Sequence, residues 1–120
     1  MSYDTNNVFA KILRGEIPCN KVYEDEHVLA FKDIRPQAKV HALVIPKGAY
    51  VSAQDFGEKA SAQEIAAFHR AVSKVARDLG VADSGYRVIA NAGAHGHQEV
   101  PHYHVHILGG QPIGKMVNLP

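Results

Sequence analysis

Both the fold and the chemistry of this chain are indicated by one stretch, His102-Tyr103-His104-Val105-His106-Ile107-Leu108. Histidine occupies every second position, and such alternation is typical of a β-strand, whose side chains point to opposite faces with a period of two. The three imidazoles would therefore share one face, and the residues between them would share the other. At the rise per residue of a strand, neighbouring histidines would lie about 6.5–7 Å apart and the outer two about 13 Å apart.

This spacing limits what the histidines can do together. A zinc–imidazole bond is about 2.0–2.1 Å long, so a straight strand cannot bring His102 and His106 to one ion, and at most two adjacent histidines could share a metal. A row of imidazoles is better suited to nucleophilic or acid–base chemistry, in which the neighbours of His104 orient it and bind an anionic substrate. The alternative interpretation is a structural or solvent-exposed histidine cluster.

The composition is that of an ordinary globular domain. The chain has 120 residues, 46% of them hydrophobic, and a formal net charge of +1. We therefore expect a single domain over residues 1–120. The balanced charge gives no reason to expect nucleic acid or a membrane as a partner. A single cysteine excludes an internal disulfide, and no secretory segment or long apolar run is visible, so we expect the cytoplasm.

Two helices are predicted from capping and periodicity. Asn6 or Asn7 can cap a short helix that Gly15 would end. A long helix should begin at Ser61-Ala62-Gln63-Glu64, which has the form of a capping box, and continue with one apolar stripe to Gly80. The sequence therefore predicts one short and one long helix.

Five strands are predicted from alternation and turn residues. They are expected over residues 21–24, 27–33, 40–45 and 86–90, with the histidine strand beginning at Val100. Residues 1–5 are expected to be a loose terminus, and residues 47–60 a polar connection. Short connections favour a mainly antiparallel sheet, with the long helix on one face and the histidines toward the other.

A glycine-containing loop over residues 91–99 leads into the histidines. Gly93 and Gly96 would allow a positive φ or a close approach of the backbone to a ligand. Because the loop leads directly into three imidazoles, the two glycines suggest an anion cradle of backbone N–H groups. His95 and His97 add two further imidazoles to this loop.

Taken together, these motifs resemble the histidine-triad (HIT) family, whose signature alternates histidine with apolar residues. Several separated motifs occur in the family's order, which makes the resemblance specific. Gly109-Gly110 after the triad is similar to the Hint branch, the histidine-triad nucleotide-binding proteins. The other matching segments are Val8–Pro18, Phe31–Ala38, His41, Val44–Lys47, Asn91–Gly93, Gly96 and Gln98–Val100.

The resemblance implies an α+β fold of the HIT type. Its five-stranded, mainly antiparallel sheet would carry one long and one short helix and continue across a homodimer. It also implies a hydrolase of the purine nucleoside phosphoramidase type, which cleaves conjugates of AMP or GMP with an amine and uses no cofactor or metal ion. His104 would attack phosphorus, and water would resolve the resulting nucleotidyl-histidine. We expect a backbone carbonyl near His102 to hold the other ring nitrogen of His104.

Further site residues follow from the same resemblance. Asp33 would hold the ribose hydroxyls with its two acceptor oxygens. Ile34, Phe9 and Phe31 would wall the purine, although the two phenylalanines could equally be core residues. The implied catalytic residues are His41, His102, His104 and His106, and the implied nucleotide-binding residues are Phe9, Phe31, Asp33, Ile34, Asn91, His97, Gln98, Glu99, His104 and His106.

Two segments depart from the Hint pattern. Glu99 replaces a serine that could donate a hydrogen bond to the leaving group, whereas an ionised carboxylate can only accept one, from an amine or a water. The tail over residues 116–120 lacks the aromatic and proline-rich character that is common in that branch. Both departures bear on the choice of substrate.

Three other functions remain open from the sequence. A dinucleoside polyphosphate hydrolase of the Fhit-like branch would use the same His104 chemistry with a nucleotide as leaving group. A nucleotide-binding or scaffold protein would show weak turnover. A metal protein would combine His102 or His106 with His95, His97 or His41.

Overall fold

The computed structural model describes residues 2–117 and 119. In chain order its elements are α1 (Val8–Leu13), β1 (Lys21–Glu24), β2 (Val28–Lys32), β3 (Val40–Pro46), α2 (Ala53–Lys59), α3 (Ala62–Asp78), β4 (Tyr86–Ile89) and β5 (Val105–Gly109). The predicted α+β class is confirmed, with five strands in the part of the chain that the structure describes. The divergent tail is described only in part, because positions 118 and 120 lie outside these residues.

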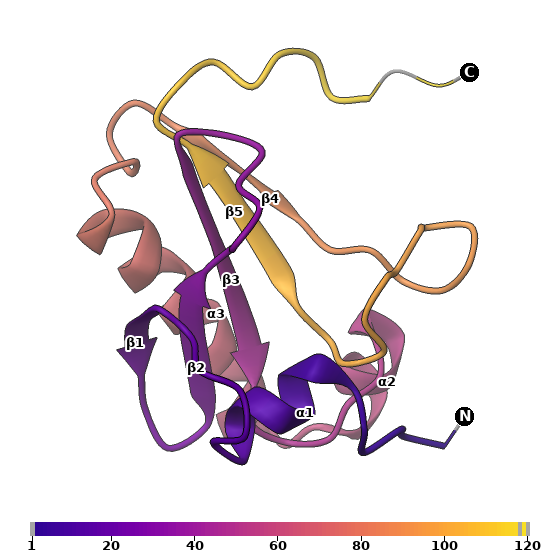
Figure 1. Ribbon diagram of the computed structural model, residues 1–120. Helices are drawn as coiled ribbons and strands as arrows, with labels where there is room; N and C mark the ends of the chain where they lie inside the picture. The colour runs from indigo at the N-terminus through magenta and orange to yellow at the C-terminus, as the bar shows by residue number, and fades with distance from the viewer. Residues whose placement is uncertain (1, 118, 120) are drawn as a thin grey trace.

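The sheet has the strand order β1-β2-β3-β5-β4, and every neighbouring pair is antiparallel (Figure 1). The predicted hairpin of the first two strands is therefore confirmed. The strand with the last triad histidine, β5, lies beside the central β3, where His106 is opposite Leu43 and Leu108 is opposite His41. This register brings His41 and His106 to the same face of the sheet.

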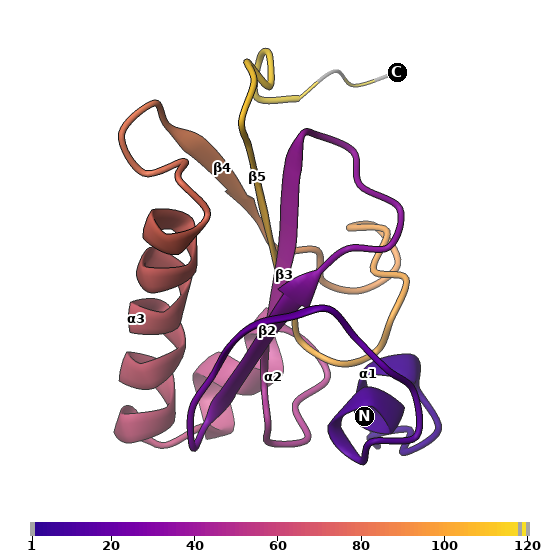
Figure 2. The same cartoon turned by 60° about the vertical axis from the view of Figure 1, so that its left-hand side comes forward.

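The two faces of the sheet are covered by different helices. Figure 2 shows α3 on one side and α1 on the other. Alternate residues such as Val44, Val105 and Ile107 pack in the larger apolar cluster with α3. Leu43 and Ile45 belong to a smaller cluster together with Phe9 of α1 and Phe31 of β2. The period of two in each strand thus sorts the side chains between two cores.

The predicted ends of the helices agree with their observed caps. Asn7 caps α1 by accepting from the Ala10 N–H at 2.9 Å. Ser61 and Glu64 form the reciprocal capping box of α3. Among the described residues, no helix combines the length and the apolar character that spanning a bilayer requires.

A third helix, α2, corrects the prediction of one short and one long helix. It lies within residues 47–60, which were expected to be a polar connection. Ser52 caps it by accepting from the Asp55 N–H. Phe56, its one buried residue, packs its ring 5.2 Å from that of Phe68. Seven residues with a single buried side chain are too few for periodicity to be visible, and Ser52 with Asp55 was the available capping signal.

The histidine strand also begins later than predicted, at Val105 instead of Val100. Pro101 has no N–H to donate to a ladder, and the His102 N–H turns back to the Val100 carbonyl at 2.9 Å. His102 and His104 therefore precede β5. The alternation of faces persists, because the ring of Tyr103 stacks 5.0 Å from that of Phe56 on the α3 side.

Candidate active site

A cavity of about 650 Å³ opens on the sheet face opposite α3. Ten of the residues predicted for the site line it: Phe9, Phe31, Asp33, Ile34, His41, Asn91, His97, Glu99, His104 and His106. Two predicted residues, His102 and Gln98, do not. Sequence reasoning missed the other lining residues, which are Val8, Ile12, Ile17, Pro18, Cys19, Lys32, Arg35, Gln37, Leu43 and Val100. The four-residue spacing of Val8 and Ile12 on one helix face was a signal for two of them.

His104 is held with one ring nitrogen directed at the protein. Its Nδ1 lies 2.7 Å from the His102 carbonyl oxygen. Because a carbonyl only accepts, Nδ1 carries the proton and the lone pair is on Nε2. Burial lowers the pKa of His104, which keeps the ring neutral at neutral pH. The Phe9 ring packs edge-on at 4.9 Å from the His104 ring. This is the arrangement of an imidazole nucleophile with a fixed tautomer.

His102 lies behind the cavity and reaches it only through its main chain. The residue has no exposed surface, and its Nε2 is 2.8 Å from the Pro46 carbonyl oxygen. Burial lowers the pKa of His102 to about 4, so the ring is neutral. Its side chain therefore touches no ligand in the cavity, and its contribution to the site is the carbonyl that fixes His104.

A second pair of imidazoles forms a directed chain of hydrogen bonds. The Gln37 N–H donates to His41 Nδ1 at 3.0 Å, which leaves the single proton of a neutral His41 on Nε2. His41 Nε2 lies 2.9 Å from His106 Nδ1, so His41 donates and His106 accepts. Burial first, and then the neighbouring imidazoles, lower the pKa of His106 to about 4. Neutral His106 thus carries its proton on Nε2, so this residue of the cavity lining can act as a hydrogen-bond donor.

Asp33, which directly follows β2, also approaches His41. Its Oδ2 is 3.5 Å from His41 Nε2, and its Oδ1 accepts from the Arg35 N–H at 2.7 Å. The resulting tight turn leaves Ile34 91% exposed at the rim of the cavity. The Asp33 carboxylate can therefore accept hydrogen bonds from hydroxyl groups of a ligand, and the adjacent Ile34 provides an apolar contact surface.

The same region contains the residues that could hold a metal ion. Among the described residues, ligand atoms of Asp33, His41 and His106 come within 4.8 Å of one another. Two imidazoles and one carboxylate are a ligand set that zinc and other transition metals accept. Neither His95 nor His97 belongs to this group. The metal alternative that used the loop histidines is therefore not supported by their positions.

The loop before the triad uses three of its backbone N–H groups for its own hydrogen bonds, and the expected anion cradle stays a prediction. The N–H groups of Gly93, His97 and Gln98 all donate within the loop, the first of them to the Gln98 side chain. The Gln98 amide also donates to the carbonyls of Val51 and Val100 at 2.6 and 2.9 Å. Gln98 therefore braces the loop. The loop's own packing also requires glycine at position 96, because a Cβ there would meet a backbone oxygen at 2.5 Å.

Glu99 and His97 form an exposed pair at the rim. His97 Nε2 lies 3.3 Å from Glu99 Oε1, and both side chains are more than three-quarters exposed. The pair stands close enough to the cavity to line it. It can therefore contact the part of a ligand that extends out toward solvent.

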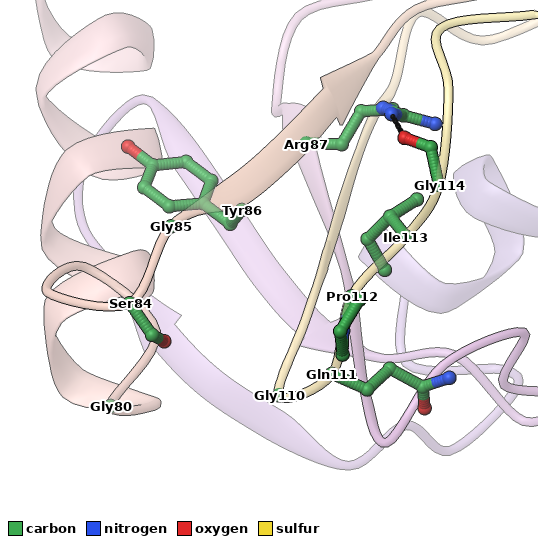
Figure 3. Close-up of a pocket in the computed structure, with 10 residues that line it drawn as sticks. All are labelled: Gly80, Ser84, Gly85, Tyr86, Arg87, Gly110, Gln111, Pro112, Ile113 and Gly114. Atoms are coloured by element: carbon green, nitrogen blue, oxygen red, sulfur yellow. Dashed lines mark hydrogen bonds between the residues drawn. The ribbon is translucent and has the colours of Figure 1, made fainter.

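A second hollow, of about 700 Å³, lies at the other end of the sheet and is shown in Figure 3. Arg87 spans it by donating to the carbonyls of Gly114 and Lys115 at 2.6 and 3.1 Å. Its lining holds four glycine, proline or isoleucine residues after β5, together with Gln111, and no histidine, cysteine or carboxylate. The chemistry described above is therefore confined to the first cavity.

Comparison with known proteins identifies the family. The model of the HIT domain matches residues 14–113. A 13.2 kDa HIT-like protein of Azospirillum brasilense is 58% identical over 116 residues, which cover 97% of this chain and 95% of that protein. The purine nucleoside phosphoramidase of Escherichia coli (strain K12) is 44% identical over 110 residues, which cover 92% of each chain.

Solved structures agree with these relatives. A histidine triad protein from Clostridium difficile superimposes with a TM-score of 0.84 at 40% identity, covering 97% of this chain and all of that one. A HIT family hydrolase from Clostridium thermocellum gives a TM-score of 0.86 at 45% identity, covering 94% of this chain and 97% of that one. The resemblance seen in the sequence is confirmed, and this chain belongs to the HIT domain family.

Proposed function

We propose that this protein is a hydrolase that cleaves purine nucleoside 5′-phosphoramidates, in which AMP or GMP is joined to an amine through a P–N bond. The observation that carries the proposal is the hydrogen bond from His104 Nδ1 to the His102 carbonyl, because it leaves the Nε2 lone pair of a neutral imidazole for attack. The similarity to the E. coli phosphoramidase supports the reaction class.

The reaction would proceed in two displacements at the α-phosphorus. His104 Nε2 forms a bond to phosphorus while the P–N bond breaks, and the amine departs with a proton from solvent. Water then attacks the nucleotidyl-histidine, the bond from phosphorus to His104 breaks, and the nucleoside monophosphate is released. Two easier steps replace one difficult displacement. The scheme draws on side chains, solvent and substrate, so we propose that no cofactor or metal ion takes part.

His106 would stabilise the charge that develops on phosphorus. Its Nε2–H, set by the chain through His41, can donate to a non-bridging phosphate oxygen as negative charge increases there. In this scheme His41 acts by fixing the tautomer of His106. Glu99 at the rim would accept a hydrogen bond from the departing amine or from the attacking water.

The nucleoside would occupy the part of the cavity between α1 and the end of β2. Asp33 would accept from the ribose hydroxyls, and Asn91 would contact the sugar or phosphate. Phe9 and Phe31 are buried members of the smaller core that also line the cavity, so both of their expected roles are compatible with their positions. With the exposed Ile34 they would form the apolar wall for the purine.

We further propose that the protein is a homodimer whose sheet continues across the two copies. The edge strand β4 supports this proposal, because Tyr86 and Val88 are large and exposed there. Analytical ultracentrifugation would show twice the chain mass, and Val88→Lys should shift the protein toward monomer. A monomeric wild-type protein at micromolar concentration would contradict the proposal.

The reaction can be tested by mixing purified protein with excess adenosine 5′-phosphoramidate, quenching the mixture and measuring the intact mass of the protein. We expect released AMP and an adenylyl mass on the peptide containing His104, with neither product in His104→Ala. If the wild-type protein releases no AMP and forms no adduct, the phosphoramidase proposal is wrong. Cleavage of a dinucleoside polyphosphate in the same assay would then support the Fhit-like function, and AMP binding alone would support a binding protein.

A further inference from the structure

The N-terminal segment, which was expected to be loose, contacts the most deeply buried histidine of the triad. The Tyr3 hydroxyl oxygen lies 2.5 Å from His102 Nδ1, although the two residues are 99 positions apart. Their rings meet edge to face, with centroids 5.6 Å apart. Met1 lies outside the described residues. Tyr3 is half-buried and is not among the residues that line the cavity.

The segment is tied to α1 by several hydrogen bonds. The Asp4 carbonyl accepts from the backbone N–H and the side-chain amide of Asn7, the latter at 2.7 Å. The Asp4 carboxylate accepts from the Asn6 N–H at 2.9 Å. Arg14 donates to the Thr5 carbonyl at 2.8 Å. Tyr3 is therefore presented to His102 by a structured turn that ends in the N-cap of α1.

The direction of the bond from Tyr3 follows from the other bond of the ring. The Pro46 carbonyl can only accept, so His102 Nε2 carries the single proton of the neutral ring. Nδ1 is consequently an acceptor, and the Tyr3 O–H donates to it. Because His102 has no exposed surface, water cannot replace the hydroxyl without opening the packing.

His102 lies in a segment before β5 that is not part of a strand, and this segment connects it to the site. The His102 carbonyl that holds His104 Nδ1 belongs to residues 100–104, which have no strand partner. The peptide unit of this carbonyl is held on one side by the Tyr103 N–H, which donates to the Tyr50 carbonyl at 2.7 Å, and on the other side by the anchoring of the His102 side chain. Its two anchors are the Tyr3 hydroxyl and the Pro46 carbonyl, on opposite nitrogens of the ring.

We infer that Tyr3 is a positioning residue: together with the Pro46 carbonyl, its hydroxyl holds His102 in one tautomer and orientation, and through the His102 carbonyl it keeps the proton of His104 on Nδ1. The catalytic part of this inference rests on the proposed phosphoramidase function. The part that concerns the nitrogen atoms does not, because it can be measured without substrate. Tyr3 touches no group in the cavity, so its loss should lower kcat and leave nucleotide affinity unchanged.

The test compares Tyr3→Phe with Tyr23→Phe in the full chain. Tyr23 is a matched control, because its half-buried hydroxyl donates to Asp25 at 2.7 Å and lies in β1 outside the cavity lining. Long-range ¹⁵N–¹H spectra report the protonation and hydrogen bonding of each ring nitrogen. In Tyr3→Phe we expect the Nδ1 signal of His102 to move toward that of an imidazole nitrogen without a donor, and the Nδ1 signal of His104 to lose protonated character.

Kinetics with adenosine 5′-phosphoramidate supply the second measurement. Tyr3→Phe should lower kcat by about 3- to 10-fold, the net value of one hydrogen bond expressed as a rate ratio. Its dissociation constant for AMP should equal that of the wild type. Tyr23→Phe should change neither kcat nor the signals of His102 and His104.

Different results would overturn different statements. Unchanged ¹⁵N signals of His102 and His104 in Tyr3→Phe would show that the hydroxyl does not set the nitrogen states, and the inference would fail. An equal fall of kcat in Tyr23→Phe would reduce the effect to a general loss of packing. If the wild-type protein releases no AMP, the proposed function fails, while the ¹⁵N spectra still decide whether Tyr3 controls the two histidines.

Discussion

In β5, His106 and Ile107 are neighbours in the chain and face opposite sides of the sheet. Ile107 has no exposed surface and packs in the apolar cluster with α3. His106 lines the cavity and hydrogen-bonds to His41, 65 residues away in sequence. The same strand thus contributes to the larger hydrophobic core on one face and to the candidate site on the other.

The comparison shows how buried imidazoles are accommodated in so small a protein. On the α3 face, stability comes from apolar burial. On the cavity face, each buried nitrogen has a partner, and no buried side-chain nitrogen or oxygen among residues 2–117 and 119 lacks one. Partners remove the penalty for burying polar atoms, and they also fix the tautomers. Changes on the two faces should therefore have separable effects.

The largest expected effect is on the cavity face. His104→Ala should lower AMP release from adenosine 5′-phosphoramidate by about 10⁴-fold or more, because the covalent route is lost with its nucleophile. Affinity for AMP should remain close to that of the wild type. His69→Ala is the matched control, since His69 is exposed on α3. Wild-type rates in His104→Ala would exclude it as the nucleophile.

On the opposite face, Phe68→Ala should affect stability instead of chemistry. Phe68 is buried between the rings of Phe56 and Tyr103, with centroids 5.2 and 4.9 Å away. Its truncation should lower the free energy of unfolding by about 3–5 kcal/mol, measured by urea denaturation. The affinity of the folded fraction for AMP should stay within about 2-fold of the wild-type value, because the packing energy of Phe68 is independent of the contacts to the nucleotide. A large loss of affinity with unchanged stability would contradict the separation of the two faces.

Acid should weaken the cavity face in part through His102. Its folded pKa of about 4 lies below the ordinary value of 6.5, so the unfolded chain binds more protons between these pH values. The free energy of unfolding should therefore be highest above pH 6.5 and decrease toward pH 4, by about 3 kcal/mol from this group. His102→Gln keeps an N–H donor for Pro46 but does not titrate. Parallel stability curves for the two proteins would rule out this contribution.

The smallest effect is expected at the nucleoside end of the cavity. Asp33→Asn removes a charged acceptor while keeping an oxygen for the Arg35 N–H. Affinity for AMP should fall by about 10-fold, the typical value of a hydrogen bond to a charged group. The variant should bind 2′,3′-dideoxyadenosine monophosphate as well as the wild type does. Equal losses for both nucleotides would argue against contact with the ribose hydroxyls.

Much of the fold could be predicted because its signals are local. The alternation around His104 separated the two faces, and Ser61 with Glu64 marked the start of α3. Adjacent strands with short turns gave the antiparallel hairpin. The motifs also predicted ten of the residues that line the cavity. Gln98 belongs to the same motif, yet its side chain makes three hydrogen bonds that brace the loop, one of them to Val51, which is distant in the sequence.

The α+β class and the family could be read from the sequence alone, and His104 could be proposed as the nucleophile, since periodicity, caps and motif spacing are properties of nearby residues. The folded structure was needed to show that α2 exists and which nitrogen of His102 and of His106 carries the proton. These features depend on contacts between residues distant in the chain, such as the packing of Phe56 against Tyr103. Tyr3 with His102, Pro46 with His102, and His41 with His106 meet only when the sheet has formed.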